Sequence, residues 1–248
     1  ARAFVDYAQI SEESKRKIAG VNLKRLLGGQ GPRHPVPIKR PHDYIVTNAR
    51  DGKAIPVSVL DAHSHTLHEE GQTAGGRYLM LDGDARGILE VSQWCGIDRV
   101  AMMSWNAPFC TDAHDGNEIV WRALQTFPER VVGVAVVDPT HMTDIEMDKE
   151  IKTRYVEQGF IGMKPYPHMN VHYEDHMFSS WWEFGNRNRL YALVHVSEET
   201  GGVPAIARLA DRFQDLSWII AHAGTDWDFA EEVAACIQQH QNVYAEIT

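Results

Sequence analysis

The sequence has few cysteines, no excess of positive charge and no long apolar run, and each shortage excludes a class of protein. Its 248 residues include three cysteines, an odd number and widely spaced, so no disulfide framework is expected and a reducing, cytoplasmic compartment is predicted. The 34 acidic residues outnumber the 24 lysines and arginines, and the net charge of −10 argues against binding to nucleic acids or anionic membranes. The longest apolar run, residues 131–137, is far shorter than the roughly 18 residues of a membrane-spanning helix.

The sequence does contain enough apolar material for one large core. Hydrophobic residues make up 44% of the chain and charged residues 23%, which is the composition of a folded protein rather than a disordered one. Histidine is the other abundant residue type, and the 13 histidines are scattered along the chain rather than gathered in a tag. Their meaning therefore depends on where each one falls relative to the predicted strands and helices.

The first 55 residues differ in pattern from the rest of the chain. Apolar side chains near helical spacing predict an amphipathic helix over 11–27, with Ser11 at the N-cap position and two glycines at its end. Residues 28–55 are rich in glycine and proline without a sustained period, which predicts a linker. We therefore predict a helical segment over 1–29, a linker over 30–55 and one large domain over 56–248.

From residue 56 onward, short apolar runs alternate with helix-like stretches. The runs are apolar through most of their length, as in strands buried on both faces of a parallel sheet, and they cover 56–62, 98–104, 131–137, 159–164, 191–196, 217–222 and 243–247. The helix-like stretches between them cover roughly 85–95, 115–127, 142–157, 177–189, 203–214 and 226–240. Strand followed by helix, repeated along the chain, predicts βα units and a parallel sheet.

Two α/β architectures accept this alternation: an open doubly wound sheet and a (β/α)8 TIM barrel. A doubly wound nucleotide-binding sheet would have a glycine-rich turn after its first strand, whereas residues 61–66 read DAHSHT. A barrel gathers its chemistry at the C-terminal ends of several different strands, where the polar residues of this sequence also fall. We therefore predict a (β/α)8 TIM barrel, of which this chain holds strands one to seven.

Two histidines and an aspartate alternate at the end of the first predicted strand. Residues i and i+2 of a strand point to the same face, so Asp61, His63 and His65 are expected to point together into the barrel. Two imidazoles held close together repel when both are protonated, and a divalent metal resolves this by binding both in the neutral form. For this pair taken alone, a chance His-x-His in a histidine-rich chain is the alternative.

Two further histidines stand at predicted strand ends. His195 lies at the end of the fifth strand and His222 at the end of the sixth, where a barrel would bring both next to the first pair. Either one alone reads as an ordinary structural or exposed histidine. Four histidines at the same ends of three strands together predict a metal site.

These segments, in this order, resemble the amidohydrolase superfamily. The resemblance is carried by DAHSH at 61–65, GFIGMKP at 159–165, YALVHVSEE at 191–199, LADRFQDLSWIIAHAG at 209–224 and QNVYAEIT at 241–248. The branch that they resemble most contains the aminocarboxymuconate-semialdehyde decarboxylase-like enzymes. The resemblance implies that His63, His65 and His195 bind a divalent metal, commonly zinc. It also implies that His222 either binds a second metal or is catalytic, polarising the substrate and the attacking water.

Further candidates follow the second and fourth predicted strands. In some amidohydrolases a lysine in the region of Lys164 is carboxylated and bridges two metals, and in others it pairs with a substrate carboxylate; an ordinary strand-end lysine is the third reading. Trp105, Tyr166 and His168 are predicted pocket walls that contact substrate, with simple packing as the alternative. Asp61 is predicted to support the metal ligands without binding the metal.

The sequence departs from the family pattern in two ways. The family carries a catalytic, metal-binding aspartate at the end of an eighth strand, and the chain stops at Thr248, just after the seventh. Residues 5–29 resemble the tail that normally closes the same domain. An excerpt from a tandem array, a circular permutation, or a missing part contributed by another chain would each explain this order. We expect the sequence to be part of a longer protein.

The leading functional prediction is a metal-dependent hydrolase that attacks a small cyclic or carboxylated substrate with metal-activated water. The first alternative is a metal-dependent, non-oxidative decarboxylase of the same superfamily, which the sequence does not separate from a hydrolase. The second is a non-catalytic barrel that lacks the eighth-strand aspartate. The expected partners are a small-molecule substrate and either a second copy of the chain or a second chain or domain that supplies the eighth strand.

Overall fold

The computed structural model describes residues 57–72, 80–107, 112–140, 142–166 and 171–247, together with Ser11, Glu13 and Lys53. The chain divides into two compact units, Ala1–Ala54 and Ile55–Thr248, and every strand and helix described below belongs to the second. The predicted helix at 11–27 and the predicted linker at 28–55 lie outside the described residues, apart from those three positions.

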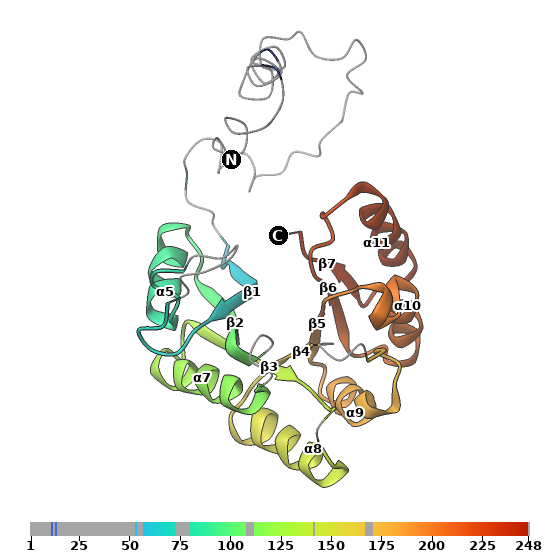
Figure 1. The fold of residues 1–248 in the computed structure, drawn as a ribbon, viewed down its shortest axis with the longest axis horizontal. Helices are drawn as coiled ribbons and strands as arrows, with labels where there is room; N and C mark the ends of the chain where they lie inside the picture. Colours follow the sequence, from blue (N-terminus) through green and yellow to red (C-terminus); the bar gives the residue numbers. More distant parts are fainter. Residues whose placement is uncertain are drawn as a thin grey trace. The chain divides into compact units, whose positions relative to one another are not determined.

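The second unit is built on seven parallel strands that follow one another in the sheet in the order of the sequence. They are β1 (Leu60–Thr66), β2 (Arg99–Ser104), β3 (Val131–Val137), β4 (Gly162–Pro165), β5 (Tyr191–Val194), β6 (Ser217–Ile220) and β7 (Val243–Ala245). Figure 1 shows these strands as a curled arc with the helices on its outer side. A doubly wound sheet would reverse its strand order part-way, so the strictly sequential order confirms the barrel-type fold.

The first strand begins later than its apolar run predicts. The run at 56–62 predicted an earlier start, with the strand ending in the DAHSH motif; β1 starts at Leu60 and carries both histidines, as the alternation of that motif predicted. His65 pairs with Met103 of β2, and the register shifts between Asp61 and Ser64. Pairing with β2 therefore continues through both histidines to Thr66.

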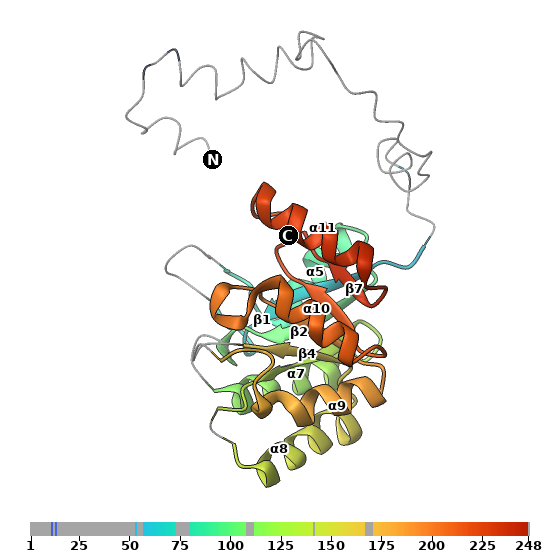
Figure 2. The same cartoon turned by 90° about the vertical axis from the view of Figure 1, so that its right-hand side faces the viewer.

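Helices connect the strands and cover the outer face of the sheet, as Figure 2 shows from the side. They are α5 (Ala85–Trp94), α7 (Ala113–Thr126), α8 (Asp144–Ile151), α9 (Ser179–Arg187), α10 (Gly202–Arg212) and α11 (Trp227–Gln239). Shorter turns are η2 (Lys152–Glu157), a π-helix that continues α8, and the 3-10 helices η3 (His176–Phe178) and η4 (Glu198–Thr200). Capping residues fix where several of these helices begin. Asp84 and Asp226, the N-cap residues of α5 and α11, accept backbone N–H groups of the first turn, and Thr143 forms a capping box with Glu146 at the start of α8.

Alternate residues of the strands divide between two apolar regions. One set points into the barrel and forms a cluster of Ala101, Met103, Val132, Val134, Val136, Leu193 and Ala221. The other set points outward, where Val100 and Met102 of β2 pack with Val120 and Ala123 of α7. The period-2 alternation of strand side chains therefore places both faces in contact with apolar neighbours, which explains why the runs read as continuously hydrophobic.

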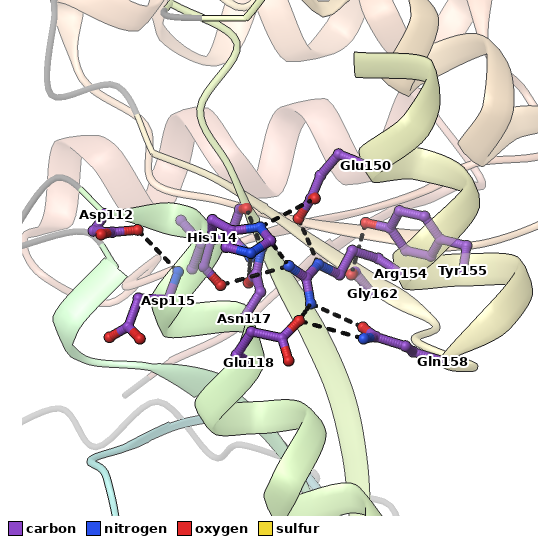
Figure 3. A network of polar contacts seen from close by, with 11 residues as sticks. Asp112, His114, Asp115, Asn117, Glu118, Glu150, Arg154, Tyr155, Gln158 and Gly162 are labelled. Atoms are coloured by element: carbon purple, nitrogen blue, oxygen red, sulfur yellow. Dashed lines mark hydrogen bonds and ion pairs between the residues drawn. The ribbon is translucent and has the colours of Figure 1, made fainter. Parts of the chain in front are cut away.

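A buried ion-pair network joins α7 to α8 and η2 on the outer layer (Figure 3). The fully buried guanidinium of Arg154 donates hydrogen bonds to Glu150 and Glu118, and its Nη1 lies 2.9 Å from Gln158 Oε1. Its Nη2 lies 3.0 Å from His114 Nδ1. The network fixes two adjacent helices to one another.

The sheet is open on one side within the described residues. β1 pairs only with β2 and β7 only with β6, so the seven strands form an incomplete barrel, as predicted. The open edges expose Leu60 at 48% and Tyr244 at 50%, which is unusual for strands of a parallel barrel. Every helix in the described ranges is too short or too polar to cross a lipid bilayer.

Candidate metal centre at the carboxyl ends of the strands

Four histidines from three strand ends meet at one end of the barrel. The ring centroids of His63 and His65 are 5.3 Å apart, those of His63 and His222 are 5.1 Å apart, and those of His195 and His222 are 5.3 Å apart. His195 directly follows β5, and His222 stands two residues after β6. The structure therefore brings together all four histidines that the sequence singled out.

A carboxylate that the sequence analysis did not single out joins this cluster. Glu246, directly after β7, places its Oε2 2.9 Å from Nδ1 of His63, and both side chains are nearly buried. The same oxygen accepts the backbone N–H of His222 at 3.2 Å. His63, His222 and Glu246 each offer a ligand atom within 4.8 Å of the others, so they form a group that could hold a metal ion. An acidic residue inside the last apolar run, at the end that faces the mouth, was the signal for it.

His222 has a backbone conformation that is rare outside glycine. Its φ is +58°, in the left-handed region. The turn is held by Thr225, whose backbone N–H and hydroxyl both donate to the carbonyl of His222, at 3.1 and 2.6 Å. Such conformations cost free energy and are found where the surrounding structure enforces them, often at functional sites.

Burial keeps three of the four imidazoles in the neutral form. Burial, together with the neighbouring Lys164, lowers the pKa of His65 to about 3 and that of His195 to about 4. Burial is also the main cause that lowers the pKa of His63. These three imidazoles are therefore neutral near pH 7, which is the form that binds a metal.

Lys164 is a buried cation on the inner face of the barrel. It lies in β4 and is 2% exposed, and burial lowers the pKa of its ammonium to about 8, while Glu246 acts in the opposite direction. No hydrogen bond or salt bridge to the Lys164 ammonium is found within the described parts of the chain. A buried cation without an ion pair is costly, so its position favours a site that receives an anionic group.

Comparison with known families assigns the chain. The model of the family described as Amidohydrolase matches residues 61–248, which is most of the sequence and all of the barrel. The chain belongs to the amidohydrolase family. None of the curated proteins matches this sequence.

Solved structures share the fold of this amidohydrolase at low sequence identity. The 4-oxalomesaconate hydratase of Rhodopseudomonas palustris is 18% identical, with a TM-score of 0.54 over 76% of this chain and 74% of its own. A probable 2-pyrone-4,6-dicarboxylic acid hydrolase of Acinetobacter baumannii, with citric acid bound, is 12% identical, with a TM-score of 0.57 over 77% and 70%. A dihydroxybenzoic acid decarboxylase of Polaromonas sp. JS666, with bound manganese and an inhibitor, is 16% identical, with a TM-score of 0.50 over 67% and 66%. An uncharacterized TIM-barrel protein of Bordetella bronchiseptica, Bb4693, is 14% identical, with a TM-score of 0.50 over 64% of this chain and 58% of its own, so the fold is that of a TIM barrel.

The donor set of the amidohydrolase site fits a divalent metal. Nδ1 of His65 is buried and has no hydrogen-bond partner within the described residues. Buried polar atoms normally have a partner, so this nitrogen is available to bind a metal. His63 uses only Nδ1 for Glu246, which leaves its Nε2 for another partner. Neutral imidazoles and a carboxylate are the ligand types of catalytic zinc and related metal sites.

The remaining predicted site residues fall at different distances from this centre. Trp105 meets His65 edge-on, with ring centroids 5.3 Å apart, and Tyr166 directly follows β4 and packs against the apolar cluster inside the barrel. Asp61 contacts the backbone rather than a ring, because its Oδ1 accepts the N–H of His63 at 3.0 Å. His168 lies outside the described residues. The roles of all four stay predictions.

Proposed function

We propose that this amidohydrolase is a metal-dependent hydrolase of a small, carboxylated substrate. The observation that carries the proposal is the gathering of four imidazoles at the carboxyl ends of the strands, with the buried cation Lys164 close enough to lower the pKa of three of them. In a barrel of this type the chemistry takes place at that end. Membership of the amidohydrolase family supports a metal-dependent enzyme. The substrate class and the reaction are what we propose here.

The proposed ligands are His63, His65 and His195, with zinc as the proposed metal. When bound, a divalent metal polarises a carbonyl group and makes water a nucleophile at neutral pH. Three protein ligands leave a position open for chemistry. His222 is proposed to act on the substrate instead, by stabilising negative charge on the oxygen that develops it.

Lys164 is proposed to bind a carboxylate of the substrate. Its ammonium is buried, so an incoming carboxylate would form an ion pair in a place with little competing water. The solved relatives support this choice by name, since one is a hydratase of 4-oxalomesaconate and another is described as a hydrolase of 2-pyrone-4,6-dicarboxylic acid. Trp105, Tyr166 and His168 are the proposed walls of the same pocket.

A second candidate reaction is non-oxidative decarboxylation. It is favoured by the fold likeness to a dihydroxybenzoic acid decarboxylase that contains manganese, and that likeness also makes manganese the second candidate metal. In this reaction Lys164 and His222 would hold the carboxylated substrate while charge develops on carbon as CO2 leaves.

The open edges of the sheet call for a partner strand. Edge strands with unpaired backbone groups and exposed apolar side chains readily accept another strand, and Leu60 on β1 and Tyr244 on β7 are both half exposed. We propose that a further strand, from another segment, domain or copy, pairs with β1 and β7 in the working enzyme.

The proposal is tested by metal analysis followed by a substrate panel. The purified chain, dialysed with zinc or manganese, is expected to retain a divalent ion, measured by inductively coupled plasma mass spectrometry. It is then incubated with cyclic esters bearing carboxylates and with hydroxybenzoates. Incorporation of 18O from labelled water into the product identifies hydrolysis, whereas release of CO2 identifies decarboxylation. The assay is repeated on a protein that includes the strand pairing with β1 and β7. If that protein binds metal but forms neither product, the enzymatic proposal is contradicted.

A further inference from the structure

The mouth of the barrel contains one carboxylate that is held from two sides. The backbone of Glu246 is tied to the strand and turn beside it, because its N–H donates to Ile220 O at 2.9 Å and its carbonyl accepts the N–H of Ala223 at 2.8 Å. Its side chain is 11% exposed. The carboxylate is thus fixed in place by main-chain bonds on both sides of its own Cα.

One oxygen of this carboxylate serves two histidines at once. Oε2 lies 2.9 Å from Nδ1 of His63 and 3.2 Å from the backbone nitrogen of His222. A carboxylate oxygen has two lone-pair directions, so these two hydrogen bonds occupy Oε2. One contact reaches across the open side of the sheet to β1, and the other reaches the strained turn after β6.

The contact with His63 has a chemical consequence for its ring. An ionised carboxylate can only accept, so the neutral imidazole must carry its proton on Nδ1. Nε2 is then left unprotonated, with its lone pair free to bind a metal. Carboxylates that accept from the second nitrogen of a ligating histidine fix its tautomer and orientation and raise its basicity.

The contact with His222 has a structural consequence. The left-handed φ of +58° requires support from outside the turn. The backbone N–H of His222 points at Glu246 Oε2, while its carbonyl is held by Thr225 from the other side. Both backbone groups of the strained residue are therefore satisfied.

We infer that Glu246 is a positioning residue that sets the Nδ1–H tautomer of His63 and holds the His222 turn, rather than a ligand of the metal. The inference rests on the proposed function only for the identity of His63 as a ligand. The tautomer of His63 is a property of the metal-free protein and can be measured there.

The first test is 15N–1H NMR of the full chain, labelled at histidine and stripped of metal. The His63 signals, assigned by their loss in His63→Gln, are expected to show the Nδ1–H tautomer in the wild type. In Glu246→Leu, which has similar volume and no acceptor, they are expected to shift to Nε2–H or to a mixture. If Glu246→Leu fails to fold, Glu246→Ala replaces it. An unchanged tautomer would overturn the inference.

The second test is the affinity for cobalt(II), measured by chelator competition, together with the visible spectrum of the cobalt-loaded protein. Glu246→Leu is expected to bind cobalt about 10- to 100-fold more weakly, which is the usual effect of losing such a partner, with unchanged band positions. Glu246→Gln, which keeps an acceptor oxygen, is expected to recover part of the loss. Glu231→Ala, an exposed change on α11, is the control and should match the wild type.

The outcomes separate the inference from the proposed function. A shifted cobalt spectrum, with Glu246→Gln as weak as Glu246→Leu, would make Glu246 a direct ligand and overturn the inference. Equal affinity in every Glu246 variant would also overturn it. A wild type that binds no cobalt contradicts the proposed function, and the tautomer measurement then still decides the role of Glu246.

Discussion

The barrel mouth and the Arg154 network both bury ionisable side chains, but they satisfy them differently. Arg154 has no exposed surface, and its guanidinium donates to Glu118, Glu150 and Gln158, so the buried charge is fully compensated (Figure 3). At the mouth, the ammonium of Lys164 has no hydrogen bond or salt bridge within the described residues. A buried cation that is fully paired stabilises the fold, whereas one left without an ion pair indicates a ligand site.

The pKa values show the same contrast. Burial raises the pKa of Glu118, but the hydrogen bonds from Arg154 and Gln158 and the charge of Arg154 together outweigh it, so the pKa lies below its ordinary value. At the mouth burial dominates, so the pKa of Lys164 falls to about 8 and that of His65 to about 3. The network therefore keeps its side chains charged, whereas the mouth keeps the imidazoles of His63, His65 and His195 neutral.

The largest expected effect is on metal binding. The double change His63→Ala and His65→Ala removes two of three proposed ligands, so the folded chain should lose its bound metal entirely, as measured by mass spectrometry of the dialysed protein. Arg154→Met, in the other region, should leave the metal content of the folded fraction unchanged. Metal content that survives the double change would show that the cluster is not the metal site.

The second effect is a loss of stability when the Arg154 network is broken. Arg154→Met leaves the buried Glu150 and the partly buried Glu118 without their partner, so the free energy of unfolding should fall by about 3–5 kcal/mol in a urea titration. Lys152→Met, two residues away, is the matched control. It breaks an exposed pair with Glu157 and should cost no more than about 1 kcal/mol. Equal losses in the two variants would mean that the network is not the stabilising element.

The third effect separates His222 from His195. His222→Asn should keep the metal while the turnover number falls by about two or more orders of magnitude, the scale of losing an oxyanion-stabilising donor. His195→Asn should instead weaken metal affinity. Turnover is followed on the substrate that the panel identifies, with metal content measured in parallel. If His222→Asn strips the metal and His195→Asn keeps it, the two roles are reversed.

The smallest effect concerns Lys164 and pH. Its pKa is lowered in the fold, so between about pH 8 and 10.5 the unfolded chain binds more protons than the folded one. The stability of the metal-free protein should therefore rise with pH across this window, by between about 1 and 3 kcal/mol. Lys164→Met should remove this rise and be more stable than the wild type at pH 7. Lys152→Met controls for the loss of a lysine, and an unchanged slope in Lys164→Met would contradict the burial argument.

The sequence by itself determined the architecture and most of the histidine site. Local apolar runs and helix caps determine the alternation of strands and helices. The strand predicted at 131–137 therefore coincides with β3, and the helix predicted at 85–95 matches α5. His63, His65, His195 and His222 could be selected because a barrel brings strand ends together whatever lies between them.

Only the tertiary structure decided what depends on contacts between distant segments. The register of β1 against β2 shifts between Asp61 and Ser64, which a local pattern does not record. Glu246 meets His63 although 183 positions separate them in the sequence, and one acid in an apolar run gives no sign of which ring it will face. The left-handed turn at His222 is likewise held by Thr225 and by Glu246 of the neighbouring strand's end. Periodicity fixes which face a side chain takes, but the choice of partner is set by packing across the barrel.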